Sequence, residues 1–91
     1  MRLAINVTER DILNGTCAKP ESCAIALATQ RAIEKHPRIW RLQVLPRTIK
    51  FFGAGNELVC CRKLPRKARE FVTRYDSGHS VRPLSFGVNL P

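Results

Sequence analysis

The residues best able to do chemistry are cations gathered at one place in the chain: Arg62, Lys63, Arg66, Lys67 and Arg69. Pro65 lies among them and predicts the start of a helix, because proline favours the first helical turn. The amino end of a helix carries partial positive charge and normally favours Asp or Glu. A bound phosphate would resolve this conflict, since the cations and the free backbone N–H groups would converge on it. The cluster therefore predicts an anion-binding site, and the alternative is a solvated charge run that salt screens.

A second group of candidate binding residues lies in the middle of the chain. It consists of Arg41, Arg47 and Lys50 with the aromatic residues Trp40 and Phe52. If the alternating apolar residues around them face the core, Arg41 and Lys50 face outward. An exposed ring beside these cations would be a contact point for a partner, whereas core burial of the ring is the alternative. Single-strand binders display several rings, so a site of the RRM or OB type is poorly supported, and strands around every helix disfavour a helix-turn-helix.

The sequence contains few residue patterns typical of catalytic or metal-binding sites. His36 precedes a proline at a helix end and His79 lies in a polar turn, and no close carboxylate pair or phosphate-binding loop occurs. We predict no catalytic residue, no cofactor and no enzyme activity.

The four cysteines do not match the spacing of a zinc site. Cys17 and Cys23 are separated by five residues, and Cys60 and Cys61 are adjacent. Neighbouring side chains in a strand point to opposite faces, so Cys60 and Cys61 cannot easily share a metal. Free thiols are predicted, and a Cys17–Cys23 disulfide or metal site stays open as the alternative.

Length and charge narrow the partner classes. The 91 residues suffice for one domain, and 16 Lys and Arg against 7 Asp and Glu give a formal charge of +9. Eleven of the cations are Arg, whose planar donors match phosphate and carboxylate oxygens in pairs. No stretch is apolar enough for a membrane span or a signal peptide, so the cytoplasm is the expected location.

The spacing of apolar residues predicts eight elements in the order β-α-α-β-β-β-α-β. They are a strand over 3–7, a short helix over about 9–14, a helix over about 23–35, strands over 42–44, 49–51 and 58–61, a helix over about 65–75 and a strand over 84–90. Residues 53–56 read as a hairpin loop. The chain is therefore predicted to be a single α+β domain over 1–91, with an antiparallel or mixed sheet of about 4–5 strands and two main helices packed on one face.

Several residues mark the ends of these helices. Thr8 and Asp11 resemble a capping box at the start of the first helix, and Gly15 is expected to end it in the left-handed conformation. Ser22 is expected to cap the second helix, which should stop before Pro37. In the third helix, the apolar stripe formed by Ala68, Phe71, Val72 and Tyr75 should face the core.

Two stretches carry a resemblance to a known group. One is Val7-Thr8-x-x-Asp11-Ile12-x-x-Gly15 with Cys23-x-Ile25-Ala26-Leu27-Ala28, and the other is Phe71-x-x-x-Tyr75-Asp76-x-Gly78 with Pro83-Leu84-x-Phe86. Both resemble small uncharacterised proteins found in bacteriophages and prophages. The resemblance covers about half of the chain and implies an accessory phage protein, such as a modulator of a host or defence system, acting in the host cytoplasm. It brings no binding or catalytic residue with it.

Three functions follow from these observations. The first is nucleic-acid binding, with the 62–69 cations and the outer strand cations contacting phosphates. The second is a protein-interaction module or inhibitor that presents Arg-rich and aromatic surface to an acidic or nucleic-acid-binding protein. The third is a site for a small anionic nucleotide at the start of the third helix. Assembly into a homo-oligomer is left open by the sequence.

Overall fold

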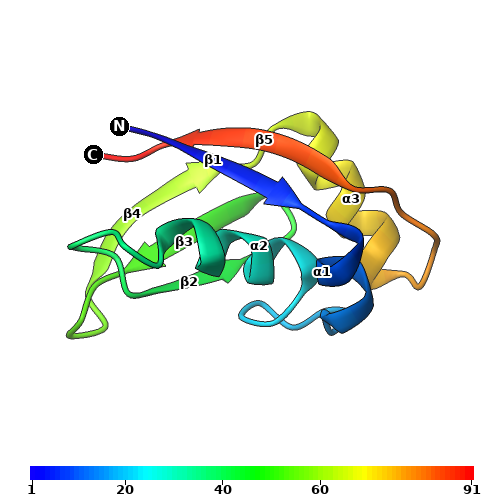
Figure 1. The fold of residues 1–91 in the computed structure, drawn as a ribbon, viewed down its shortest axis with the longest axis horizontal. Helices are drawn as coiled ribbons and strands as arrows, with labels where there is room; N and C mark the ends of the chain where they lie inside the picture. The colour runs from blue at the N-terminus through cyan, green and yellow to red at the C-terminus, as the bar shows by residue number, and fades with distance from the viewer.

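The computed structural model describes residues 1–91 as an α+β fold whose eight elements follow the predicted order (Figure 1). The elements are β1 (Arg2–Val7), α1 (Glu9–Asn14), α2 (Ala24–Ile33), β2 (Arg41–Val44), β3 (Thr48–Phe52), β4 (Leu58–Lys63), α3 (Arg66–Asp76) and β5 (Leu84–Asn89). The predicted class and order are thus confirmed. None of the three helices is long and apolar enough to cross a lipid bilayer.

The five strands form two antiparallel sheets where one sheet of about 4–5 strands was expected. β1 pairs with β5, the two ends of the chain, and β2, β3 and β4 form a meander in that order. A side chain bridges the two sheets: Arg62 of β4 donates through Nε to the carbonyl oxygen of Asn89 in β5, at 2.8 Å. The two sheets are thus joined at this point by a side chain, and no backbone pairing connects β4 to β5.

Helix α2 lies between the two sheets. It contacts both β1 and β2, and Figure 1 shows it between these strands. Its buried residues are Ala24, Ile25, Ala26, Ala28, Thr29 and Ile33. The many alanines let the strands approach closely, and the Thr29 hydroxyl is satisfied by donating to the carbonyl of Ile25 at 2.7 Å. The helix is therefore enclosed by both sheets, beyond the packing on one face that was expected.

The predicted alternation of buried and exposed residues along the strands is confirmed by the residues that form the core. The buried strand residues are Leu3, Ile5, Val7, Leu42, Val44, Ile49, Phe51, Cys60, Phe86 and Val88. The stripe of α3 is buried as expected, at Ala68, Phe71, Val72 and Tyr75. Tyr75 stacks on Phe71, and its hydroxyl donates to the carbonyl of Ile12 at 3.0 Å, which ties α3 to α1.

Two helix ends differ from the sequence prediction. Gly15 ends α1 with φ of −73°, so the left-handed conformation was wrong. A side chain is excluded there by contact, because a Cβ on Gly15 would lie 2.5 Å from the Tyr75 hydroxyl and 2.6 Å from the nitrogen of Ala24. Helix α2 begins one residue later than expected, with Cys23 and not Ser22 at its N-cap. The carbonyl of Ser22 accepts from the N–H of Thr16 in the preceding loop, so the first helical bond runs from the N–H of Leu27 to the carbonyl of Cys23.

Candidate functional site

The outward side of α3 is strongly cationic. Because the helix buries the stripe from Ala68 to Tyr75, the residues between these positions face away from the core. Two shallow clefts run along this side, one on each flank of the helix, and both are lined by Glu70 and Arg74. The exposed side of α3 is therefore a ridge between two clefts.

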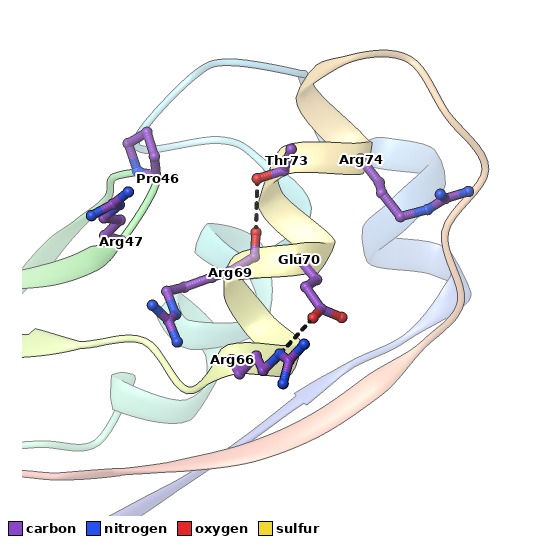
Figure 2. A pocket seen from close by; sticks show the side chains of 7 residues that line it. All are labelled: Pro46, Arg47, Arg66, Arg69, Glu70, Thr73 and Arg74. Atoms are coloured by element: carbon purple, nitrogen blue, oxygen red, sulfur yellow. Dashed lines mark hydrogen bonds and ion pairs between the residues drawn. The ribbon is translucent and has the colours of Figure 1, made fainter.

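The first cleft lies between α3 and the tip of the β2–β3 hairpin and has a volume of about 570 Å³. It is lined by Pro46, Arg47, Arg66, Arg69, Glu70, Thr73 and Arg74. Figure 2 shows Arg69 extending from α3 toward the hairpin tip that carries Arg47. Neither guanidinium has a hydrogen-bond or ion-pair partner in the protein. Two free arginines thus border one cleft whose only nonpolar residue is Pro46.

The second cleft lies on the opposite flank of α3, against the segment that leads to β5, and its volume is about 500 Å³. It includes the cations Lys67, Arg74 and Arg82. Arg74 points to this side in Figure 2, and its Nε and one terminal nitrogen donate to the carbonyl of Ser80 at 3.3 and 3.1 Å. Arg74 thereby holds the segment against the helix, while Lys67 and Arg82 remain free.

The charged residues of the two clefts define what we call the α3 face: Arg47, Arg66, Lys67, Arg69, Arg74, Arg82 and Glu70. Six cations and one carboxylate give this face a charge of +5 of the total +9. The rest of the chain has ten cations and six carboxylates. More than half of the excess positive charge is therefore concentrated on one helix and its two neighbouring loops.

The single carboxylate of the α3 face is held by an exposed ion pair. Arg66 Nε lies 2.9 Å from Glu70 Oε1, one helical turn away. Pairs of this kind contribute about 0.3–0.5 kcal/mol on a helix surface, and the order with the cation first is the weaker one. Arg66 can therefore exchange this partner for another anion at little cost.

The five cations of the predicted cluster are divided by the structure. Arg66 and Arg69 line the first cleft and Lys67 lines the second. Lys63 is exposed on β4, opposite Thr48. Arg62 bridges the sheets and also donates to the carbonyl of Cys61 at 3.0 Å. The cationic site thus includes the first turn of α3, with Arg66, Lys67 and Arg69, and extends along the side of the helix to Arg74.

The second predicted group is placed mostly elsewhere. Arg47 joins the α3 face, but Arg41 lies at the other end of the β2–β3 hairpin. Its guanidinium stacks on the ring of Phe52 at 4.3 Å, donates to Asn56 at 3.1 Å and pairs with Glu21 at 3.2 Å. Arg41 is therefore engaged within the protein, and the half-buried Phe52 is covered by it.

The two remaining members of that group also lie apart from the α3 face. Lys50 is half-buried in the centre of β3, between Gln43 and Cys61. Trp40 has 65% of its surface exposed. Neither residue lines the two clefts of α3.

Sequence reasoning missed Arg74 and Arg82. Arg74 could have been found, because Lys67, Glu70 and Arg74 are spaced i, i+3, i+7 and must share one side of the helix. Arg82 carries no such signal, since it comes to α3 only through the path of the loop before β5.

The cysteines and histidines form no second centre. All four cysteines are free thiols, and Cys60 is buried while Cys61 is exposed, as their strand positions predict. Burial raises the pKa of the Cys23 and Cys60 thiols, which keeps them protonated and poorly nucleophilic. No three His, Cys, Asp or Glu side chains come together in a way that could hold a metal. Comparison of the chain with known protein families, characterised proteins and solved structures gives no match.

Proposed function

We propose that this protein binds nucleic acid by contacting phosphates with its α3 face. The observation that carries the proposal is the pair of free guanidinium groups, Arg47 and Arg69, that come from different elements to border the first cleft. Arginine presents parallel donors that match two phosphate oxygens at once. An unpaired cation beside other cations raises the energy of the folded protein slightly, and a polyanion removes that repulsion.

The distribution of the cations favours a polymer of phosphates over a single nucleotide. Free cations lie on both flanks of α3, with Arg69 in one cleft and Lys67 and Arg82 in the other. A single small anion could reach only one flank. The first cleft also lacks an aromatic ring on which a base could stack, a contact that nucleotide sites use, and Pro46 is its only nonpolar residue. A phosphate backbone uses both flanks and needs no stacking.

The test is the salt dependence of binding to a fluorescent 20-base-pair duplex, measured by anisotropy. Four phosphate contacts predict a slope of about −3.6 in a plot of log K against log salt, or about a 100-fold loss between 50 and 200 mM. The double variant Arg47→Ala/Arg69→Ala should lower the slope by about 1.8 and weaken binding about 30-fold at 150 mM salt.

The matched control is Arg10→Ala/Arg38→Ala, which removes the same charge from exposed residues outside the α3 face. It should change the slope far less than the Arg47/Arg69 variant. Equal losses in both double variants would show a general charge effect and contradict the assignment. An affinity that does not vary with salt, or no binding, would contradict the function itself.

An interaction with a protein is the second candidate, and a separate surface favours it. Trp40 and Leu58 are 65% and 55% exposed, although both are large apolar residues, and tryptophan is enriched among residues that dominate protein interfaces. An accessory phage protein that modulates a host or defence protein would use such a contact. A partner that the wild type retains from nuclease-treated lysate, and that Trp40→Ala loses while Arg47→Ala/Arg69→Ala keeps, would establish it.

A further inference from the structure

The shape of the α3 face suggests which nucleic acid it fits. A helical ridge stands between two clefts, with Arg47 and Arg69 bordering one cleft and Lys67 and Arg82 bordering the other. We propose that α3 enters the major groove of B-form duplex DNA and that the two clefts receive the sugar–phosphate backbones on either side. This inference rests on the proposed nucleic-acid function and adds the kind of nucleic acid and the mode of docking.

The dimensions of the two partners match. An α-helix with its side chains is about 10–12 Å wide, and the major groove of B-DNA is about 12 Å wide. A helix lying in that groove has one phosphate backbone on each side. The α3 face has cations on each side of its ridge. With the helix in the groove, each row of cations would lie beside one of the two phosphate backbones.

The crest of the ridge carries the residue types that read base edges. Glu70 borders both clefts, so it lies on the crest, and Arg66 is paired with it one turn earlier. A carboxylate repels a phosphate, which makes Glu70 unfavourable for a surface that only contacts backbone. It can accept from the N4 amino group of cytosine, and an arginine can donate to O6 and N7 of guanine. The pair is thus suited to a C·G step in the floor of the groove.

Other nucleic acids fit this surface less well. The major groove of A-form RNA is too deep and narrow for side chains to enter, and a helix cannot lie in it. Single strands are held by exposed aromatic rings, and the only ring beside either cleft is that of Phe71, which is buried. The exposed Trp40 lines neither cleft. Duplex DNA is the form that uses the ridge and both flanks together.

The first experiment compares affinities at one salt concentration for a 20-base-pair DNA duplex, an RNA duplex of the same sequence and each single DNA strand. The DNA duplex should bind at least 10-fold more tightly than the others, and methyl green, a major-groove ligand, should compete while netropsin, a minor-groove ligand, should not. Equal or tighter binding to RNA or to a single strand, or competition by netropsin alone, would overturn the docking mode and leave the nucleic-acid function standing. Absence of binding to every nucleic acid would overturn both.

The second experiment tests the two flanks separately. Lys67→Ala/Arg82→Ala should weaken DNA binding about as much as Arg47→Ala/Arg69→Ala, about 30-fold at 150 mM salt, because each pair meets one backbone. These four side chains make no internal hydrogen bond, so neither variant should unfold at a lower temperature than the wild type. A loss confined to one pair would mean that the duplex does not straddle the helix.

The third experiment tests the crest. Glu70→Gln keeps the length of the side chain but removes the charge and adds a donor, so the sequences selected from a random duplex pool should change at the position of the C·G step. Selection of the same sequences by wild type and Glu70→Gln, or no preference in either, would show that Glu70 does not read a base.

Discussion

Two arginines of this protein, Arg31 and Arg69, lie on helix surfaces but have opposite surroundings. Arg31 of α2 donates to both carboxylate oxygens of Asp11, at 2.9 Å each, and to the carbonyl of Asn6 at 2.9 Å. It thereby joins α1, α2 and β1. Arg69 of α3 has no partner and borders a cleft with another free arginine. Where an arginine holds the fold together, the chain supplies its acceptors, and for Arg69 it supplies none.

The carboxylate that accepts from Arg31, that of Asp11, has further donors as well. The Asp11 side chain is 6% exposed and also accepts from the backbone N–H and the hydroxyl of Thr8, at 2.9 and 3.0 Å. The hydrogen bond from Arg31 outweighs the effect of burial and lowers the pKa of Asp11 to about 2. A buried carboxylate with so many donors is structural, whereas a free guanidinium at the surface is available to a ligand.

Removing the contact between Arg31 and Asp11 should give the largest loss of stability. Arg31→Ala leaves the buried Asp11 carboxylate without its cation, and we expect the free energy of unfolding to fall by about 2–3 kcal/mol, below the full value for a buried pair because Arg31 is half exposed. Urea denaturation followed by circular dichroism measures it. Thr29, two residues before Arg31, donates to the backbone carbonyl of Ile25 and should be unaffected. A loss under about 1 kcal/mol in Arg31→Ala would contradict the structural role of Arg31.

The pH dependence of stability should report the same contact. The pKa of Asp11 is about 2 in the folded protein against the ordinary value of 3.8 in the unfolded chain, so the unfolded chain takes up this proton first as the pH falls. The contribution of the carboxylate is complete above about pH 4 and is lost between about pH 4 and pH 2, and it amounts to about 2 kcal/mol. The measurement is unfolding by urea from pH 6 to pH 2 in wild type and in Asp11→Asn. The wild-type advantage should disappear toward pH 2, and a constant difference across this range would contradict the low pKa.

Around Arg31 and on the α3 face, the sequence predicts contacts between residues close in the chain and misses contacts between residues far apart in it. Thr8 and Asp11 are three residues apart, so their capping box could be predicted, although Asp is shorter than the usual acid. Arg31 is twenty residues further along the chain, and no sequence pattern near it indicates that it pairs with Asp11. Likewise, the buried stripe of α3 follows from spacing alone, but Arg47 and Arg82 reach the helix only through the fold.

Sequence proximity was also misleading at Arg62. This residue stands in the densest run of cations, yet its position in β4 turns it to the side where β5 lies, and it bonds to Asn89. Charge density along a chain therefore does not separate a structural arginine from a free one. Only the direction of each side chain, which the packing of the two sheets decides, makes that distinction.

Arg62→Ala tests the distinction between structural and free arginines. Arg62 stands among the free cations in the sequence but, like Arg31, is bonded within the fold. A charge-assisted hydrogen bond at a partly exposed position predicts a loss of about 1 kcal/mol and a fall of about 4–8 °C in the unfolding temperature. The salt slope of DNA binding should stay within about 0.3 of the wild-type value, since no phosphate contact is lost. A full unit of change in that slope, with no loss of stability, would place Arg62 among the binding residues.

Arg69→Ala should give the smallest effect on stability, and with the opposite sign. Arg69 lies one turn after Arg66 and faces the side of Arg47, and like charges at this spacing destabilise a helix by about 0.2–0.5 kcal/mol. Alanine also has the higher helix propensity. We therefore expect Arg69→Ala to be more stable by up to about 0.5 kcal/mol in low salt, with the gain shrinking at 0.5 M salt as the repulsion is screened. Arg69→Gln, which removes the charge and keeps much of the side-chain length, should show the same salt dependence. A destabilisation of 1 kcal/mol or more would mean that Arg69 has a partner within the protein, and it would then belong with Arg31 and not with the free cations of the α3 face.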